Sequence, residues 1–141
     1  MAMVNPDQET FRAFLKTDYD GGPIIGVNFF RYRERANYAS DADVEGSTDI
    51  SGREAYGRYW ANTITEAAKV GAKPVLQGRA LFSVIVPEGE QWDDVALVQY
   101  PSRDAFVEMQ KNPIYKAGLK HRDAGLADTR LVMICPGELF E

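Results

Sequence analysis

The chain has 141 residues, of which 45% are hydrophobic and 26% charged, as in an ordinary soluble globular protein. Its net charge is −5 and it has no basic block, which excludes the usual electrostatic footprint of proteins that bind nucleic acid or anionic membranes. This length suits one domain with a real core, so we predict a single domain over residues 1–141.

Few sequence features indicate the cellular compartment of the protein or a metal site. Cys135 is the only cysteine, so no internal disulfide can form, and its apolar neighbours predict a small buried hydrophobe. Residues 1–4 lack the charged and apolar regions of a signal peptide, and no apolar stretch could span a bilayer. We therefore predict a cytoplasmic protein. One histidine and one cysteine cannot build a structural zinc site, and no glycine-rich phosphate loop is present, so we predict neither metal nor cofactor.

The first half of the chain predicts a helix, a strand and a second helix. Helical spacing of aromatic residues predicts a short amphipathic helix over residues 7–17, and β-branched and aromatic residues predict a strand at 24–32. The connection at 34–50 is long and polar, and such loops are either functional lids or disordered. Ser51 and Glu54 form a capping box that opens the second helix.

The second half of the chain predicts a hairpin, two helices and a last strand. Residues 75–86 are a long β-type run, and 95–100 supply the strand that completes the hairpin. Ser102 caps a helix. Asparagine and proline at 112–113 end that helix and begin another, and residues 130–135 form the last strand.

An arginine–acid–alanine–aromatic motif at residues 53–56 recurs in kind at 103–106. Each copy opens a helix after a β-rich run, so one strand-then-helix unit is used twice. The resulting order is βαββαβ with a preceding helix, and its simplest closed solution is an α+β ferredoxin-like fold with an antiparallel sheet. We interpret both copies of the motif as scaffold.

Both faces of the predicted sheet are apolar. Large apolar side chains alternate across the strand at 24–32, with Ile24, Phe30 and Tyr32 on one face and Ile25, Val27 and Phe29 on the other. Helices in this topology cover one face only, so the second face predicts a homodimer that pairs sheet against sheet. The alternative is that the N-terminal helix or the long loop covers it.

Polar residues within the strands are candidates for binding. Gln77 and Arg79 share one face of their strand, and register decides whether Asn28 lies on the same face. In one interpretation they line a cleft and hold a carboxylate or carbonyl oxygen, which suits the arginine fork. In the other, Arg79 pairs with an acidic neighbour and Asn28 bonds to backbone. Likewise, Tyr59 and Trp60 either wall an apolar pocket or pack in the core.

His121 is the only histidine, and therefore the only side chain whose ordinary pKa lies near neutral pH. It lies at the edge of the apolar stripe of its helix. That position fits a cleft wall, where histidine would transfer a proton, and it fits a half-exposed surface residue. A third possibility is an axial ligand to haem.

Four segments together resemble the bacterial family called domain of unknown function 1330, namely residues 27–36, 51–56, 100–106 and 121–131. The resemblance implies a ferredoxin-like protomer of the dimeric α/β-barrel superfamily. That superfamily includes cofactor-independent monooxygenases, isomerases, haem-dependent enzymes and stress proteins. Asn28, Arg31 and His121 match recurrent positions of the family, which has no established activity to transfer.

Two functional hypotheses follow. In the first, the protein is a small-molecule enzyme of oxygenase, isomerase or lyase type, and a small organic acid or oxygenated aromatic binds in a cleft. His121 then transfers a proton, Asn28 with Arg31 or Arg79 holds an oxygen, and Tyr59 contacts the ligand. In the second, the protein is a ligand-binding or stress-related dimer without catalysis, and the same residues are structural.

Overall fold

The computed structural model describes residues 2–38 and 49–137, so most of the long connection at 34–50 lies outside the described residues. The elements in chain order are α1 (Gln8–Lys16), β1 (Ile24–Tyr32), α2 (Gly52–Lys69), β2 (Lys73–Arg79), β3 (Asp94–Tyr100), α3 (Arg103–Lys111), α4 (Pro113–Gly125) and β4 (Leu126–Ile134). The predicted order βαββαβ after an initial helix is confirmed. None of the described helices is long and apolar enough to cross a membrane.

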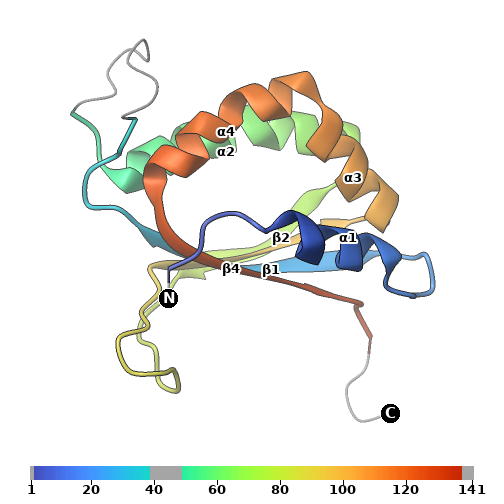
Figure 1. Ribbon diagram of the computed structural model, residues 1–141, viewed down its shortest axis with the longest axis horizontal. Coiled ribbons are helices and arrows are strands. Elements are labelled where there is room, and N and C mark those ends of the chain that lie inside the picture. Colours follow the sequence, from blue (N-terminus) through green and yellow to red (C-terminus); the bar gives the residue numbers. More distant parts are fainter. Residues whose placement is uncertain (1, 39–48, 138–141) are drawn as a thin grey trace.

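The four strands form one antiparallel sheet in the order β2-β3-β1-β4. Helices α2 and α4 lie side by side over one face of this sheet, and α3 leads into α4 at one end (Figure 1). This arrangement is the predicted α+β ferredoxin-like fold.

Side-chain caps define where the helices begin. Ser51 accepts a hydrogen bond from the Glu54 backbone N–H at 3.0 Å, and the Glu54 carboxylate accepts one from the Ser51 N–H at 3.4 Å. This is the predicted capping box, which satisfies donors that the first helical turn leaves free. Asn112 ends α3 and also caps α4, because its side-chain oxygen accepts a hydrogen bond from the Ile114 N–H at 2.7 Å.

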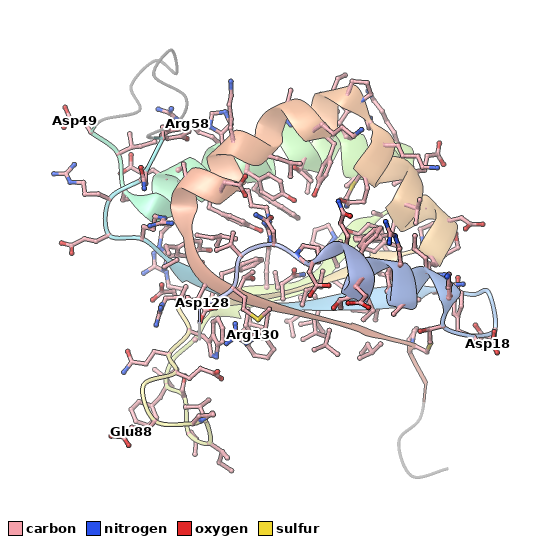
Figure 2. All side chains as sticks on the ribbon, viewed as in Figure 1. Asp18, Asp49, Arg58, Glu88, Asp128 and Arg130 are labelled. Atoms are coloured by element: carbon pink, nitrogen blue, oxygen red, sulfur yellow. The ribbon has the colours of Figure 1, made fainter. Side chains whose placement is uncertain are left out.

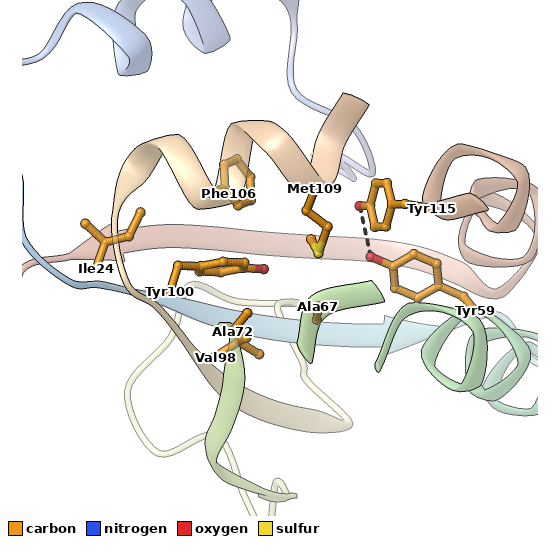
Figure 3. Packing of buried hydrophobic residues seen from close by; sticks show 9 residues of the cluster. All are labelled: Ile24, Tyr59, Ala67, Ala72, Val98, Tyr100, Phe106, Met109 and Tyr115. Atoms are coloured by element: carbon orange, nitrogen blue, oxygen red, sulfur yellow. Dashed lines mark hydrogen bonds between the residues drawn. The ribbon is translucent and has the colours of Figure 1, made fainter. Parts of the chain in front are cut away.

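The main core fills the space between the helices and the sheet (Figure 3). Its buried members are Ile24, Tyr59, Ala67, Ala72, Val98, Tyr100, Phe106, Met109 and Tyr115. The hydroxyls of Tyr59 and Tyr115 lie 3.0 Å apart and tie α2 to α4. Because both hydroxyls are buried, removing one of them would leave the other without a hydrogen-bond partner in the core, which is costly.

Helix α1 packs against α3 and leaves the other face of the sheet uncovered. Its residues Phe11 and Phe14 contact Phe106, with ring centroids 6.4 Å and 5.9 Å away. Arg103 donates a hydrogen bond to the Phe14 carbonyl at 2.9 Å and another to the Thr17 carbonyl. The suggestion that the N-terminal helix covers the second sheet face is therefore wrong.

Three sequence predictions need correction. Strand β2 ends at Arg79, whereas we predicted a strand over 75–86, because its partner β3 begins only at Asp94 and residues beyond Ala80 have no ladder to join. Strand β4 begins at Leu126, four residues earlier than predicted, where it pairs with the end of β1. Cys135 is exposed, since it follows the last paired residues of β4.

The face of the sheet that carries no helix, here called the helix-free face, is apolar as predicted. Leu76, Leu97, Val27 and Val132 are register partners in one row across all four strands. Leu76 and Val132 at the two ends of the row are exposed. A sheet face in contact with water normally carries polar side chains, so this pattern indicates that something covers the face.

Candidate functional site

A cleft of about 380 Å³ lies between α2 and strands β1, β3 and β2. Its lining residues are Asn28, Phe30, Tyr32, Arg53, Tyr56, Gly57, Tyr59, Trp60, Thr63, Ala67, Gln77, Gly78, Arg79, Asp94, Val95, Ala96, Val98 and Tyr100. The volume falls within the range of small-molecule sites, which are mostly apolar with a few converging polar groups.

Strand register brings the predicted polar residues to one face. Asn28 pairs with Ala96, and Ala96 pairs in turn with Gln77, so these three residues form one row toward α2. In the next row on the same face, Asp94 lies between Phe30 and Arg79. Asn28, Gln77 and Arg79 therefore share the cleft, which the sequence left open.

One face of helix α2 forms a wall of the cleft. Arg53, Tyr56, Trp60, Thr63 and Ala67 follow each other at three- or four-residue steps, which places them on one helical face. The face is aromatic near the start of the helix and small near its end. Thr63 interrupts the apolar and aromatic part of this face, which runs from Tyr56 to Ala67, and it is 3% exposed.

A charged cluster fixes one end of the cleft. The Asp94 carboxylate oxygen Oδ2 accepts hydrogen bonds from the Arg53 guanidinium and the Tyr32 hydroxyl, each at 2.6 Å. The Arg53 guanidinium also lies 4.7 Å from the centre of the Tyr32 ring. Arg53 thus stabilises the negative charge of a carboxylate that the protein partly shields from water, which is the setting in which such a pair is strongest.

Two buried polar atoms in the described part of the chain have no hydrogen-bond partner, and both belong to residues that line the cleft. They are Thr63 Oγ1 and Asp94 Oδ1. Leaving a buried polar group unpaired costs about 1–3 kcal/mol, so native proteins rarely tolerate it without a reason. Both atoms are shielded from solvent, so a ligand reaches them only when the side chains that cover them move.

Burial raises the pKa of four tyrosines around the cleft above the ordinary value of 10.0, namely Tyr32, Tyr56, Tyr59 and Tyr100. The hydrogen bond to the Asp94 carboxylate adds to this rise for the pKa of Tyr32. These phenols therefore keep their protons at all physiological pH values. In the cleft they act as neutral hydrogen-bond donors and not as phenolate bases.

This shift predicts how the fold responds to alkali. A phenol whose pKa is raised by folding contributes stability that is complete below the unfolded pKa near 10 and is lost as pH rises toward the folded value. We expect the phenolate absorbance of Tyr32, Tyr56, Tyr59 and Tyr100 to rise in the same step as the loss of circular dichroism. Tyr100→Phe should reduce the amplitude of that step. Full phenolate absorbance in a chain that is still folded would contradict the expectation.

The structure separates the predicted site residues into two groups. Asn28, Arg79 and Tyr59 line the cleft. The Asn28 amide nitrogen donates to the backbone carbonyls of Gly26 and Ala96, each at 3.2 Å, so this part of its side chain is engaged within the sheet. Arg79 is exposed at the edge strand. Thus Arg79 lies at the rim of the cleft with its side chain open to solvent.

Arg31 and His121 do not line the cleft. Arg31 is in register with Asp128 and alternates with Asn28, which directs it to the helix-free face. His121 is half-buried on α4, where its Nδ1 lies 2.6 Å from the hydroxyl of the buried Tyr38. Asp128 accepts hydrogen bonds from the Met3 N–H and from Arg130, and not from His121.

Sequence reasoning missed Arg53, Thr63 and Asp94. Arg53 belongs to the repeated motif that we interpreted as scaffold, and its counterpart Arg103 does hold α1 in place. Thr63 had a usable signal, because it interrupts an apolar helical stripe. Asp94 gave none, since its role depends on contacts with Arg53 and Tyr32, which are far from it in sequence. No group of three His, Cys, Asp or Glu side chains among residues 2–38 and 49–137 is placed to hold a metal ion.

The fold and the cleft define an α+β ferredoxin-like domain with a site sized for a small molecule. The sequence profile of the family described as "Domain of unknown function (DUF1330)" matches residues 46–135. The chain belongs to this family. A search of curated proteins found no match.

Solved structures similar to this chain agree with that fold. Two structures are of RPA0582, described in one of them as a protein of unknown function from Rhodopseudomonas palustris. The methylated form is 35% identical over 99% of this chain and 98% of that chain, with a TM-score of 0.88. The second is 34% identical over 99% and 100%, with a TM-score of 0.87.

More distant structures share the fold alone. A dabb family protein with a ferredoxin-like fold from Mesorhizobium loti is 12% identical over 83% of this chain and 99% of that chain, with a TM-score of 0.52. SnoaB, a cofactor-independent oxygenase from Streptomyces nogalater, is 13% identical over 84% and 97%, with a TM-score of 0.51.

Proposed function

We propose that the cleft under α2 binds a small oxygenated aromatic molecule or organic acid, and that the protein is an enzyme acting on it. The observation that carries this proposal is the pair of unpartnered buried atoms, Thr63 Oγ1 and Asp94 Oδ1, in residues that line an aromatic-walled cleft. A ligand that carries oxygen atoms supplies the missing partners, and its ring packs against the aromatic walls.

In this proposal, different cleft residues contact different parts of the ligand. Trp60 and the neighbouring tyrosines contact the apolar body of the ligand, and the protonated phenols of Tyr56 and Tyr100 donate hydrogen bonds to its oxygens. Arg79 at the rim takes a carboxylate or carbonyl oxygen, for which its planar fork is suited. Asp94 accepts a proton or hydrogen bond from a ligand hydroxyl, and Arg53 stabilises the carboxylate throughout.

The reaction type follows from neutral phenols and one carboxylate acting together. A proton passes from an activated position of the ligand to the Asp94 carboxylate, while phenols donate hydrogen bonds to the ligand oxygen that gains charge. Such proton removal is the first step shared by cofactor-independent oxygenation, isomerisation and lyase chemistry. SnoaB, which shares the fold, is a cofactor-independent oxygenase. The alternative function is binding without turnover, and it is favoured by the engagement of the Asn28 amide with backbone carbonyls.

Neither His121 nor Arg31, both predicted from the sequence to act at the ligand, contacts it in this proposal. His121 bonds to Tyr38 and lies outside the lining of the cleft, so we place Asp94 and not His121 at the ligand. In this account, Arg31 belongs to the opposite side of the sheet and does not contact the ligand.

Binding of a phenolic acid is the first test. We expect 4-hydroxybenzoate to bind the wild-type protein in calorimetric titrations, and Arg79→Met to weaken that binding about 10-fold, because a charge-assisted hydrogen bond is lost. Arg35→Met is the matched control, because Arg35 is exposed and does not line the cleft. Benzoate and phenol show whether the carboxylate or the hydroxyl carries the affinity. Equal losses in Arg79→Met and Arg35→Met would contradict the placement of Arg79.

We also propose that two copies pair through their helix-free faces to form a homodimer. The apolar row from Leu76 to Val132 supports this pairing, since exposed apolar surface of this extent normally marks an interaction site. A two-fold dimer covers the same face on both copies at once. The cleft lies on the opposite side of the sheet and stays open in such a dimer.

A further inference from the structure

Residues 80–93, which connect β2 and β3, form an arm that extends from the sheet on the side away from the helices (Figure 1). Four large apolar side chains of this arm are almost fully exposed: Leu81 99%, Phe82 79%, Val84 80% and Ile85 92%. So many apolar groups on one short segment are a strong sign of an interaction surface.

Backbone hydrogen bonds fix the root of the arm. The Ala80 N–H donates to the Asp93 carbonyl at 2.9 Å, and the Asp93 N–H donates to the Phe30 carbonyl at 2.7 Å. The Asp93 carboxylate accepts a hydrogen bond from the Tyr32 N–H at 2.9 Å, next to the register shift at the end of β1. The two ends of the arm are thus held together and joined to β1.

Side chains at the root also rest on the helix-free face. Trp92 contacts Phe29, with ring centroids 5.7 Å apart, and the Arg130 guanidinium lies 5.3 Å from the centre of the Trp92 ring. Arg130 also pairs with Glu90 at 3.6 Å and with Asp128 at 2.6 Å. Figure 2 shows Arg130 and Asp128 at the end of the sheet from which the arm extends, and Glu88 near the far end of the arm. The root is anchored while the apolar side chains remain exposed.

We propose that the arm of one copy packs across the helix-free face of a second copy, so that two arms clasp a two-fold dimer. The inference rests on the sheet pairing proposed above and adds the element that completes it. The arm projects on the side of its own helix-free face yet leaves its four large side chains exposed, so they remain available to a second copy. The apolar row containing Val27 and Leu97 offers that copy a surface of the same chemistry.

The size of the sheet indicates how much an arm adds to the interface. Four strands spaced about 4.8 Å apart and about seven residues long cover a face of roughly 19 Å by 23 Å, or on the order of 450 Å². A stable interface buries about 800 Å² on each partner. The flat projection of the bare face is smaller than this accessible area, and the arm with its four exposed side chains adds apolar surface to it.

Charge favours a second copy over a lipid bilayer as the occupant. The chain carries a net charge of −5, and the arm itself includes the acidic residues Glu88 and Glu90 beside its apolar side chains. A segment that inserts into membranes normally flanks its apolar residues with lysine and arginine. Carboxylates near the far end of the arm oppose insertion but are tolerated at the rim of a protein interface.

The first experiment measures the dimer dissociation constant by sedimentation at several protein concentrations. We expect the wild type to be a dimer at micromolar concentration and Leu81→Asp/Ile85→Asp to raise the dissociation constant about 100-fold or more, since each substitution occurs twice in the interface. Ile114→Asp is the control, because Ile114 is apolar and exposed on α4. Val132→Asp tests the sheet face separately from the arm.

The second experiment locates the arm while keeping an apolar group at residue 85. Ile85→Cys is prepared together with Cys135→Ser, which removes the only native cysteine, and carries a benzophenone photocrosslinker. Equal amounts of unlabelled and ¹⁵N-labelled chains are mixed before illumination. We expect crosslinked peptides of mixed isotope composition that join the arm to residues of β1 or β4 on the helix-free face of the other copy.

Each alternative outcome overturns the proposal in a distinct way. Crosslinks confined to single chains, or a dissociation constant that Leu81→Asp/Ile85→Asp changes no more than Ile114→Asp does, would exclude the arm while leaving the sheet pairing to the Val132→Asp result. A monomeric wild type would exclude both the arm contact and the sheet pairing, whether or not the arm binds phosphatidylcholine vesicles. Titration with 4-hydroxybenzoate tests the cleft independently, because the cleft lies on the other side of the sheet.

Discussion

Gly52→Ala is expected to lower the free energy of unfolding by about 3 kcal/mol, the upper part of the usual range for overpacked sites. A Cβ atom at residue 52 would lie 2.2 Å from the Arg33 carbonyl oxygen and 2.6 Å from both the Arg33 nitrogen and the Gly125 carbonyl oxygen. All three are backbone atoms, so no flexible side chain can move aside.

The same three residues form a backbone junction that closes the fold. The Gly52 N–H donates to the Arg33 carbonyl at 3.0 Å, and the Arg33 N–H donates to the Gly125 carbonyl at 2.8 Å. The junction joins the start of α2 to the end of β1 and the end of α4. A side chain at residue 52 would therefore have to separate elements that these hydrogen bonds hold together.

Thermal and urea unfolding measure this effect, with Gly57→Ala as the matched control. Gly57 lies on the same helix and is exposed, and a Cβ atom at residue 57 would meet no described atom within 4 Å. Alanine there should raise stability by about 0.5–1 kcal/mol through helix propensity alone. For Gly52→Ala we expect a melting temperature lower by about 10 °C. Equal and small effects at both glycines would contradict the close approach.

Thr63→Val is expected to stabilise the protein and weaken ligand binding at the same time. Valine has nearly the shape of threonine but lacks the hydroxyl, so it removes a buried polar atom that has no partner in the described residues. That change should raise the free energy of unfolding by about 1 kcal/mol. If the hydroxyl exists to meet a ligand oxygen, the variant should also bind 4-hydroxybenzoate about 10-fold more weakly.

The opposite signs of these two effects make Thr63 informative. A residue retained only for packing would show no loss of binding when its unpaired hydroxyl is removed. Thr65→Val on the exposed side of the same helix should change both quantities little, since exposed substitutions usually stay within about 0.5 kcal/mol. A Thr63→Val protein that is less stable than wild type would show that the hydroxyl has a partner in solution.

Local chemistry explains why much of the fold could be predicted. The bounds of β1 and the capping box of α2 depend on residues adjacent in sequence, and both were confirmed. Residues 80–86 have the same β-type composition as a strand, but they have no neighbouring strand to pair with. In sequence, an apolar segment that packs against a second molecule looks the same as one that is buried inside its own fold.

The cleft was harder to predict because long-range register assembles it. Asn28 and Gln77 lie in one row of the sheet only because each pairs with Ala96, and no local sequence pattern predicts that pairing. Asp94 pairs with Arg53, which lies on a helix far from it in sequence. His121 attracted attention for its residue type alone, and the structure places it beside Tyr38 instead of in the cleft.

The most direct test of a ligand site in the cleft is to map where a ligand binds by heteronuclear NMR. Wild-type protein with labelled threonine methyl groups and tryptophan indoles is titrated with 4-hydroxybenzoate. We expect saturable shifts at the Thr63 methyl and the Trp60 indole N–H, with Thr65 and Trp92 unchanged, because only the first pair lines the cleft. Shifts confined to Thr65 or Trp92, or no saturable shift at Thr63 and Trp60, would contradict this expectation.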